Sequence, residues 1–196
     1  MKAQIYRFKI VYVGYENVVN REVEVSSNYT LARLGCCVLV AFDTLAYHLF
    51  NMSFNGTLYE IPDYYDFELD ESTVDPRDIR LSKLNMNIGD SIEMTYDYGC
   101  DQQFLLTLES ITEMVKGSGP SYPKIIAGTG KGILDDVPPS EFGEIINKID
   151  RNGISNHRYM APSGKEESWD YRDFDPVFAN MSFRNLVEYV AQAFEA

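Results

Sequence analysis

The clearest structural signal in this chain of 196 residues is the stretch NIGDSIEMTYDYGCDQQFLLTLE, residues 87–109. Apolar residues alternate with polar ones over 92–97, and the alternation resumes over 104–109 after a tight connection at Gly99. A period of two places every second side chain on the same face of a strand. The stretch therefore predicts an antiparallel β-hairpin over about 91–111.

A second hairpin and a helix are predicted near the N-terminus. Residues 4–13 are rich in Ile, Val, Tyr and Phe, and apolar residues alternate with polar ones over 19–25, beyond a connection near Gly14. Thr30 is suited to cap a helix whose apolar residues recur at spacings of three and four as far as Leu49. A lone hairpin cannot bury its apolar side. We therefore predict an α+β fold, in which an antiparallel or mixed sheet built from two hairpins carries this long helix on one face.

The second half of the chain is predicted to contain a long loop and two helices. Glycine and proline are too dense over 117–140 for a regular element to continue through it. Apolar spacing predicts a short helix over about 141–150 and a C-terminal amphipathic helix over about 182–195. The segment between these helices is polar, and Trp169 and Tyr171 are its expected anchors in the core.

The length and composition restrict the class of protein. A chain of this length with 45% hydrophobic residues can bury a sizeable core, and we expect one domain over 1–196. Thirty Asp and Glu oppose 17 Lys and Arg, which gives a formal net charge of −13, and no cluster of basic residues stands out. Because phosphate backbones are bound by clustered cations, we do not expect a nucleic-acid partner.

The cysteines and the apolar runs favour the cytoplasm. Cys36 and Cys37 are adjacent and Cys100 stands alone, a spacing that fits neither a disulfide framework nor a zinc knuckle. We expect the adjacent pair to pack as small apolar residues in the helix. The most apolar window, 34–42, is about half of the ~20 residues that a membrane helix requires. We therefore expect a cytoplasmic protein without a membrane segment.

Two patterns resemble cofactor motifs but lack the necessary spacing. The sequence GTGKG at 128–132 lacks the four residues that precede the Gly-Lys pair of a phosphate-binding loop, and no Ser or Thr follows its lysine. The histidines, His48 and His157, have no cysteine or carboxylate at the spacing of zinc ligands. We expect neither a cofactor nor a resident metal ion.

The most conspicuous chemical group is the sequence YDYGCD, residues 96–101, at the turn of the hairpin. Two nearby carboxylates can share a proton or bind a divalent cation. Alternatively, Asp97 and Asp101 accept hydrogen bonds from backbone amides of the turn, and Gly99 supplies a positive φ. The sequence leaves both possibilities open.

In this order of features the chain resembles the plasmid pRiA4b ORF-3-like family, whose hallmark is Tyr-Asp-Phe-Gly-Asp, then an aromatic residue, and later Pro-Pro-Glu-Asp. The resemblance covers about 1–185, and the residues that carry it are Tyr96, Asp97, Tyr98, Gly99, Pro138, Pro139, Glu141, Phe174, Asp175, Pro176 and Asn180. It implies an α+β fold and a place among cytoplasmic, prokaryotic, mobile-element-associated proteins without an established activity. The chain departs from the family pattern at Cys100, where the family has Asp, and at Ser140, where the family has Glu.

Two main hypotheses for function follow. The preferred one is a non-enzymatic binding or accessory protein that recognises a protein or peptide in a groove between the turn at 96–101 and the loop at 117–140, because loops often carry recognition. Its candidate binding residues are Tyr96, Asp97, Tyr98, Gly99, Asp101, Pro138, Pro139 and Glu141. The rival is a metal-assisted hydrolytic enzyme that uses Asp97, Asp101 and Glu141 as ligands or acid–base groups. A third hypothesis is that the acidic surface imitates nucleic acid.

Overall fold

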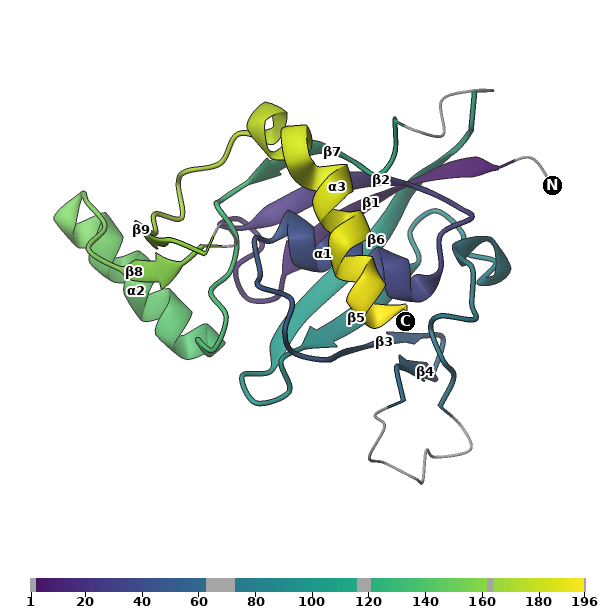
Figure 1. Cartoon of the computed structure of the whole chain (residues 1–196), viewed down its shortest axis with the longest axis horizontal. Coiled ribbons are helices and arrows are strands. Elements are labelled where there is room, and N and C mark those ends of the chain that lie inside the picture. Colours follow the sequence, from purple (N-terminus) through teal and green to yellow (C-terminus); the bar gives the residue numbers. More distant parts are fainter. Residues whose placement is uncertain (1–2, 63–72, 116–120, 162–163, 196) are drawn as a thin grey trace.

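A central antiparallel sheet organises the protein in the computed structural model, which describes residues 3–62, 73–115, 121–161 and 164–195. Within these residues the sheet has the order β4-β3-β5-β6-β1-β2-β7 (Figure 1). Its strands are β1 (Gln4–Tyr12), β2 (Asn20–Ser26), β3 (Phe50–Phe54), β4 (Thr57–Glu60), β5 (Ser91–Tyr96), β6 (Gln102–Glu113) and β7 (Lys124–Thr129). The two predicted hairpins are β1–β2 and β5–β6, and they join where β1 pairs with β6 from Gln4 opposite Glu113 to Tyr12 opposite Phe104. The predicted α+β fold is confirmed.

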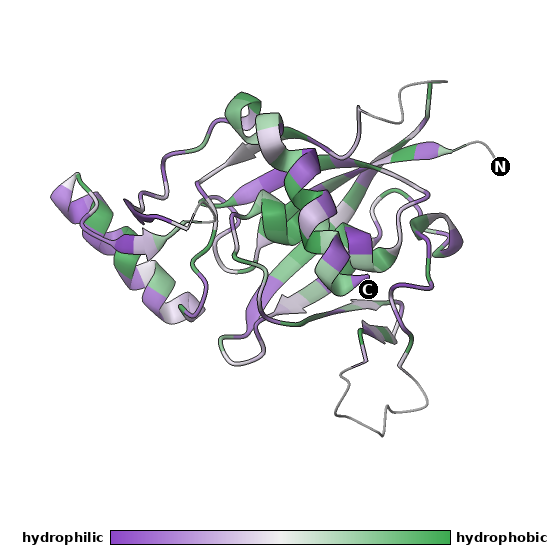
Figure 2. Ribbon diagram, viewed as in Figure 1, coloured by the Kyte–Doolittle hydropathy of each residue, from purple (hydrophilic) through white to green (hydrophobic). Residues whose placement is uncertain are grey.

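Two helices form successive layers over one face of this sheet. α1 (Leu31–Ala41) packs against the strands, and α3 (Pro176–Phe194) lies across α1 (Figure 1). Of the eleven residues of α1, only Arg33 and Val40 are not buried, and Figure 2 shows this helix mainly in green. A helix that is apolar on all sides needs a covered position, and α1 has the sheet beneath it and α3 above it. Cys36 and Cys37 are fully buried there, as predicted.

The first helix is shorter than predicted. Thr30 caps it by accepting a hydrogen bond from the Arg33 amide (3.0 Å), but the helix ends at Ala41 and does not reach Leu49. Asp43 and Ala46 both have left-handed backbone conformations, with φ of 56° and 55°. The carbonyl of Phe42 accepts instead from the amide of Ile133 (3.0 Å). Tertiary contacts with the 130–137 loop thus override the helical spacing of the apolar residues.

The second half of the chain differs from its prediction in two places. β7 lies inside the predicted loop over 117–140, of which 117–120 fall outside the described residues. α3 begins at Pro176 rather than near 182, because Asp175 caps it by accepting from the amides of Val177 (2.7 Å) and Phe178 (3.3 Å), and proline is favoured at the first helical position. No helix in the described part of the chain is long and apolar enough to cross a membrane.

The remaining elements lie outside the sheet. They are the 3₁₀ turn η1 (Leu81–Lys83), α2 (Pro139–Asn152), β8 (Arg158–Met160) and β9 (Glu166–Ser168). α2 includes the helix predicted over 141–150. Trp169 anchors this region as predicted: it is fully buried, with its ring centroid 5.3 Å from that of Phe142. Tyr171 is half-buried, and its hydroxyl donates to Asp150 (2.6 Å).

Arg21 is a fully buried cation on β2 whose guanidinium is satisfied by backbone carbonyls. The guanidinium lies over the aromatic ring of Phe174, with its carbon atom 3.7 Å from the ring centroid. It donates hydrogen bonds to the carbonyls of Ala41 (2.7 Å), Asn20 (2.7 Å), Thr129 (2.6 Å) and Lys131 (2.9 Å). One side chain thereby ties together the end of α1, the end of β7 and the loop that follows β7.

We predict that Arg21→Lys lowers the free energy of unfolding by about 3 kcal/mol, because one ammonium cannot satisfy four carbonyls spread around a planar guanidinium. The measurement is urea denaturation. Arg7→Lys is the matched control, since Arg7 lies at the surface of β1 and pairs with Glu24 (3.0 Å). It should cost less than about 1 kcal/mol. Equal losses in the two variants would contradict the role assigned to Arg21.

Asp43 gives a second prediction, on the dependence of stability on pH. Burial raises the pKa of its carboxyl from 3.8 to about 6; Arg21 and Lys131 oppose this rise, and Asp173 and Glu167 add to it. Because the folded protein holds the proton more tightly than the unfolded chain does, the group favours folding below pH 3.8, and this contribution is lost as the pH rises through 6.

The free energy of unfolding of the natural protein, relative to that of Asp43→Asn, should therefore fall by up to about 3 kcal/mol between about pH 4 and about pH 7.5. Asparagine suits this position, because it tolerates the left-handed backbone that Asp43 adopts. Urea denaturation of both proteins at the two pH values measures the difference. A difference that does not change with pH would show that the carboxyl is not protonated preferentially in the folded state.

Candidate functional site

The turn between β5 and β6 is built around the backbone of Asp97. Its carbonyl accepts hydrogen bonds from the amides of Asp101 (2.7 Å) and Cys100 (3.0 Å). Asp97 and Asp101 both adopt left-handed conformations, with φ of 52° and 54°. Asp and Asn enter this region more readily than other side chains that carry a Cβ. The left-handed positions of the turn therefore fall on the two aspartates, and Gly99 does not have a positive φ.

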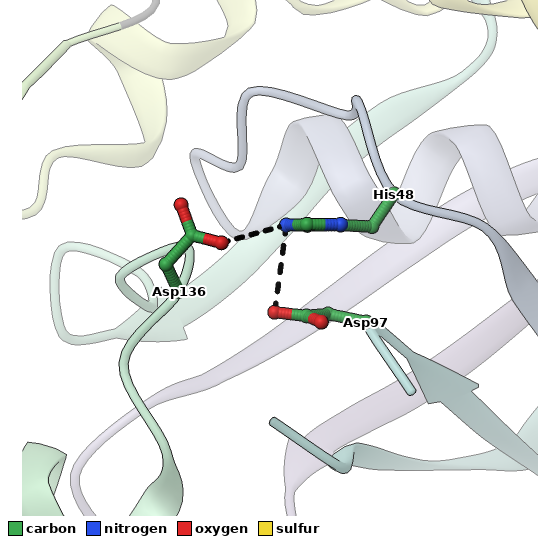
Figure 3. A group of neighbouring side chains, drawn as sticks. All are labelled: His48, Asp97 and Asp136. Atoms are coloured by element: carbon green, nitrogen blue, oxygen red, sulfur yellow. Dashed lines mark hydrogen bonds and ion pairs between the residues drawn. The ribbon is translucent and has the colours of Figure 1, made fainter. Parts of the chain in front are cut away.

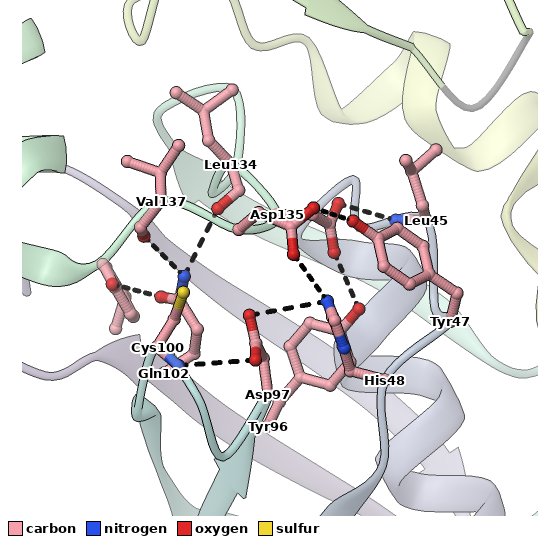
Figure 4. A network of polar contacts seen from close by, with 12 residues as sticks. Leu45, Tyr47, His48, Tyr96, Asp97, Cys100, Gln102, Leu134, Asp135 and Val137 are labelled. Atoms are coloured by element: carbon pink, nitrogen blue, oxygen red, sulfur yellow. Dashed lines mark hydrogen bonds and ion pairs between the residues drawn. The ribbon is translucent and has the colours of Figure 1, made fainter.

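Three segments that are distant in the sequence meet at this turn (Figure 4). They are the turn itself, the 44–49 segment that links α1 to β3, and the 133–137 loop that precedes α2. Gln102, which is fully buried, donates to the carbonyls of Val137 (2.7 Å) and Leu134 (3.3 Å) and accepts from the hydroxyl of Tyr12. Gln102 thus holds the loop against the hairpin.

Asp135 connects the same three segments and has both of its carboxylate oxygens engaged. One oxygen accepts from the hydroxyl of Tyr96 (2.7 Å), and the other accepts from the amide of Leu45 (2.9 Å). Burial raises the pKa of the Asp135 carboxyl, while these two hydrogen bonds and the nearby His48 act in the opposite direction. Because both of its oxygens accept hydrogen bonds from the protein, this carboxylate holds the three segments together and has little capacity left to bind a ligand.

Figure 3 shows a second polar group, formed by His48, Asp97 and Asp136. The Nε2 atom of His48 lies 2.9 Å from Oδ1 of Asp136 and 3.6 Å from Oδ2 of Asp97. One ligand atom from each residue lies within 4.8 Å of the other two, so the group could hold a metal ion. The hydrogen bond from Tyr47, together with His48, lowers the pKa of Asp136.

The Asp97 carboxylate is the unusual member of this group. Asp97 is only 4% exposed, and its buried Oδ2 atom has no hydrogen-bond partner among the residues that the structure describes. Its Oδ1 atom is 3.4 Å from the amide of Cys100, which is a long contact for a hydrogen bond. An unpaired buried oxygen is costly, and a carboxylate oxygen more so than a neutral one.

The other residues predicted for the site are distributed more widely. Asp101 is exposed, and both of its oxygens accept from the side-chain amide of Gln103 (3.0 Å each), so it does not join the group of His48. Tyr98 is exposed and donates to Glu60 (2.5 Å). Pro138 and Pro139 form the start of α2, where the Pro139 carbonyl accepts from Tyr15.

Glu141 lies in the first turn of α2 and lines a different hollow, together with Lys148 and His157. The structure thus brings Tyr96 and Asp97 together with the 133–137 loop, but it separates Asp101 and Glu141 from them. Sequence reasoning missed His48, Asp135 and Asp136 as members of the site. His48 lies 88 residues from Asp136, and no local spacing signals that they are neighbours.

Comparison with known proteins identifies similar chains. The family model described as plasmid pRiA4b ORF-3-like protein matches residues 4–182. The crystal structure of MM3350 from Methanosarcina mazei Go1, a protein of unknown function, is similar, with a TM-score of 0.71 and 20% sequence identity over 91% of this chain and 98% of that one. At this identity the likeness establishes the fold alone. No curated protein matches the chain.

The role of Gln102 gives a prediction for the site. Gln102→Leu keeps the volume but leaves the hydroxyl of Tyr12 and the carbonyls of Leu134 and Val137 without this partner, and it should lower the free energy of unfolding by about 2–4 kcal/mol. Gln103→Leu, at the exposed neighbouring position, should cost less than about 1 kcal/mol. Urea denaturation measures both. Similar losses for the two variants would refute the assigned role.

Proposed function

Since the chain belongs to the plasmid pRiA4b ORF-3-like family and its own residues form a polar site at the turn between β5 and β6, we propose that it is a binding protein for a basic segment of a protein partner. The binding surface, which we call the acidic aromatic face, is formed by Tyr47, Leu49, Tyr98, Glu60 and Asp136. It lies where the 44–49 segment meets the turn at 96–101. The amide of Asp97 donates to the carbonyl of Leu49 (3.1 Å), so the two segments are side by side.

The observation that carries this proposal is the exposure of large side chains beside carboxylates. Tyr47, Leu49 and Tyr98 are 53%, 41% and 45% exposed, and each tyrosine hydroxyl donates to an acid, Tyr47 to Asp136 and Tyr98 to Glu60. An aromatic ring next to a carboxylate suits a Lys or Arg side chain, which can contact the ring through its cation and the acid through hydrogen bonds. The protein as a whole carries a net charge of −13, which attracts a basic partner.

The rival hypothesis of hydrolysis through Asp97 and Asp101 is not proposed. It requires the two carboxylates to converge on one reacting atom. The side chain of Asp101 is instead exposed and hydrogen-bonded to Gln103, and Glu141 lines another hollow.

Fluorescence anisotropy with a labelled peptide that alternates Lys and Arg with Gly and Ser tests the proposal. Tyr47→Ala and Tyr98→Ala should each weaken binding by about two- to fivefold, because each removes one ring that faces a cation. Added salt should weaken binding further, since the attraction lies at the surface. EDTA is present throughout, so that metal ions do not contribute.

Tyr189→Ala is the matched control for these variants. Tyr189 is 73% exposed on α3, a helix that contributes no residue to the acidic aromatic face, and its removal should leave the affinity unchanged. An equal loss in the control would place the peptide elsewhere. Binding of an acidic peptide of the same length with the same affinity would overturn the proposal.

A further inference from the structure

We propose that His48, Asp97 and Asp136 bind a divalent first-row transition metal ion through Nε2 of His48 and one carboxylate oxygen of each aspartate. This inference goes beyond partner binding and does not depend on it. The three residues come from the segment after α1, the end of β5 and the loop before α2 (Figure 3).

The spacing of the three atoms fits the inner shell of a metal ion. Bonds of 2.0–2.2 Å to nitrogen and oxygen place tetrahedral ligands about 3.4 Å apart. The observed separations from Nε2 are 2.9 Å to Asp136 and 3.6 Å to Asp97, and all three atoms lie within 4.8 Å of one another. Small side-chain adjustments therefore suffice for all three to contact one ion.

The Asp97 oxygen provides an independent reason to expect a ligand. Its Oδ2 atom is buried, faces His48 and accepts no hydrogen bond. The neighbouring Asp135 differs, because both of its oxygens accept hydrogen bonds from the protein. Asp101 differs as well, because it lies at the surface with Gln103 as its partner. A divalent ion would supply the missing interaction for a buried carboxylate that the described residues leave unsatisfied.

The surroundings would orient the ligands and admit the ion. The hydroxyl of Tyr47 donates to the second oxygen of Asp136, and the rings of Tyr47 and Tyr96 lie 4.3 Å and 5.8 Å from the imidazole of His48. Such contacts fix the direction of metal ligands. The side chain of Asp136 is 66% exposed, so an ion can enter from solvent.

The ligand set indicates the class of ion. One imidazole with two carboxylates suits zinc, manganese, iron or cobalt, whereas calcium and magnesium prefer oxygen ligands alone. Three protein ligands leave at least one coordination position for water or for a group of a bound molecule. The site would therefore hold an ion that remains accessible.

Isothermal titration calorimetry of the full chain with Zn²⁺, Mn²⁺ and Co²⁺ tests the proposal, and the visible absorption of Co²⁺ reports its coordination. We expect one ion per chain, and we expect Asp97→Asn, Asp136→Asn and His48→Gln each to weaken binding by about tenfold or more. The two aspartates have left-handed backbones, with φ of 52° and 58°, which asparagine tolerates. These variants should therefore remain folded, which circular dichroism verifies.

Asp101→Asn is the matched control, because it removes one acid from the same turn at a φ of 54°. It should change the affinity by less than twofold. Absence of binding by all three ions, or an equal loss in Asp101→Asn, would overturn the site. Equal affinity for Mg²⁺ would overturn the assigned class of ion. The peptide assay contains EDTA, so failure of the metal site leaves the partner proposal standing, and the reverse also holds.

Discussion

The hydrogen bonding of the Arg21 guanidinium is the constraint on which the rest of the structure depends. No carboxylate of the described residues lies in hydrogen-bond contact with Arg21, and a buried cation in this situation requires many acceptors. Arg21 obtains them from backbone carbonyls. The Ala41 carbonyl lies at the C-terminal end of α1, where the helix dipole favours a positive charge. The Lys131 carbonyl lies at the start of the loop that leads to α2. Arg21 thus fixes the points from which the 44–49 segment and the 133–137 loop depart.

Beyond these two points, hydrogen bonds hold the 44–49 segment and the 133–137 loop against the hairpin turn. Gln102 binds the 133–137 loop from the side of β6, and Asp135 binds β5 and the 44–49 segment from the side of the loop. Satisfied networks of this kind in a low dielectric are rigid, because each member would be costly to leave unpaired. Within this frame two buried side-chain oxygens, Oγ1 of Thr44 and Oδ2 of Asp97, accept no hydrogen bond from the described residues. Only the oxygen of Asp97 belongs to a carboxylate, so it is the one that a cation would stabilise most, in keeping with the proposed metal site.

The parts of the fold that depend on local patterns could be predicted from the sequence. Both hairpins could be predicted, because apolar residues alternate with polar ones over 92–97 and 104–109 in one hairpin and over 19–25 in the other. The end of α1 could not, because the apolar spacing continues to Leu49 while contacts with a loop 90 residues away turn the chain at Asp43. β7 could not be predicted, because it lies in a segment dense in glycine and proline and because only Ile125 among its residues is buried, so the strand has no alternating apolar pattern. The neighbours of His48 come from two distant segments, so spacing along the chain could not reveal them.

The sequence presented turn chemistry and ligand chemistry at Asp97 as alternatives, but the two roles are compatible, because they would use different atoms of one residue. The backbone carbonyl of Asp97 closes the turn through the amides of Cys100 and Asp101, and the left-handed φ of 52° favours Asp or Asn at this position. Because the carbonyl makes the turn, the carboxylate is not needed for it and remains directed toward His48. Asn would serve the turn equally well and would avoid burying a carboxylate whose Oδ2 atom accepts no hydrogen bond from the described residues. The fold therefore does not explain why Asp rather than Asn stands at this position, whereas a cation bound at Oδ2, as proposed above, would explain it.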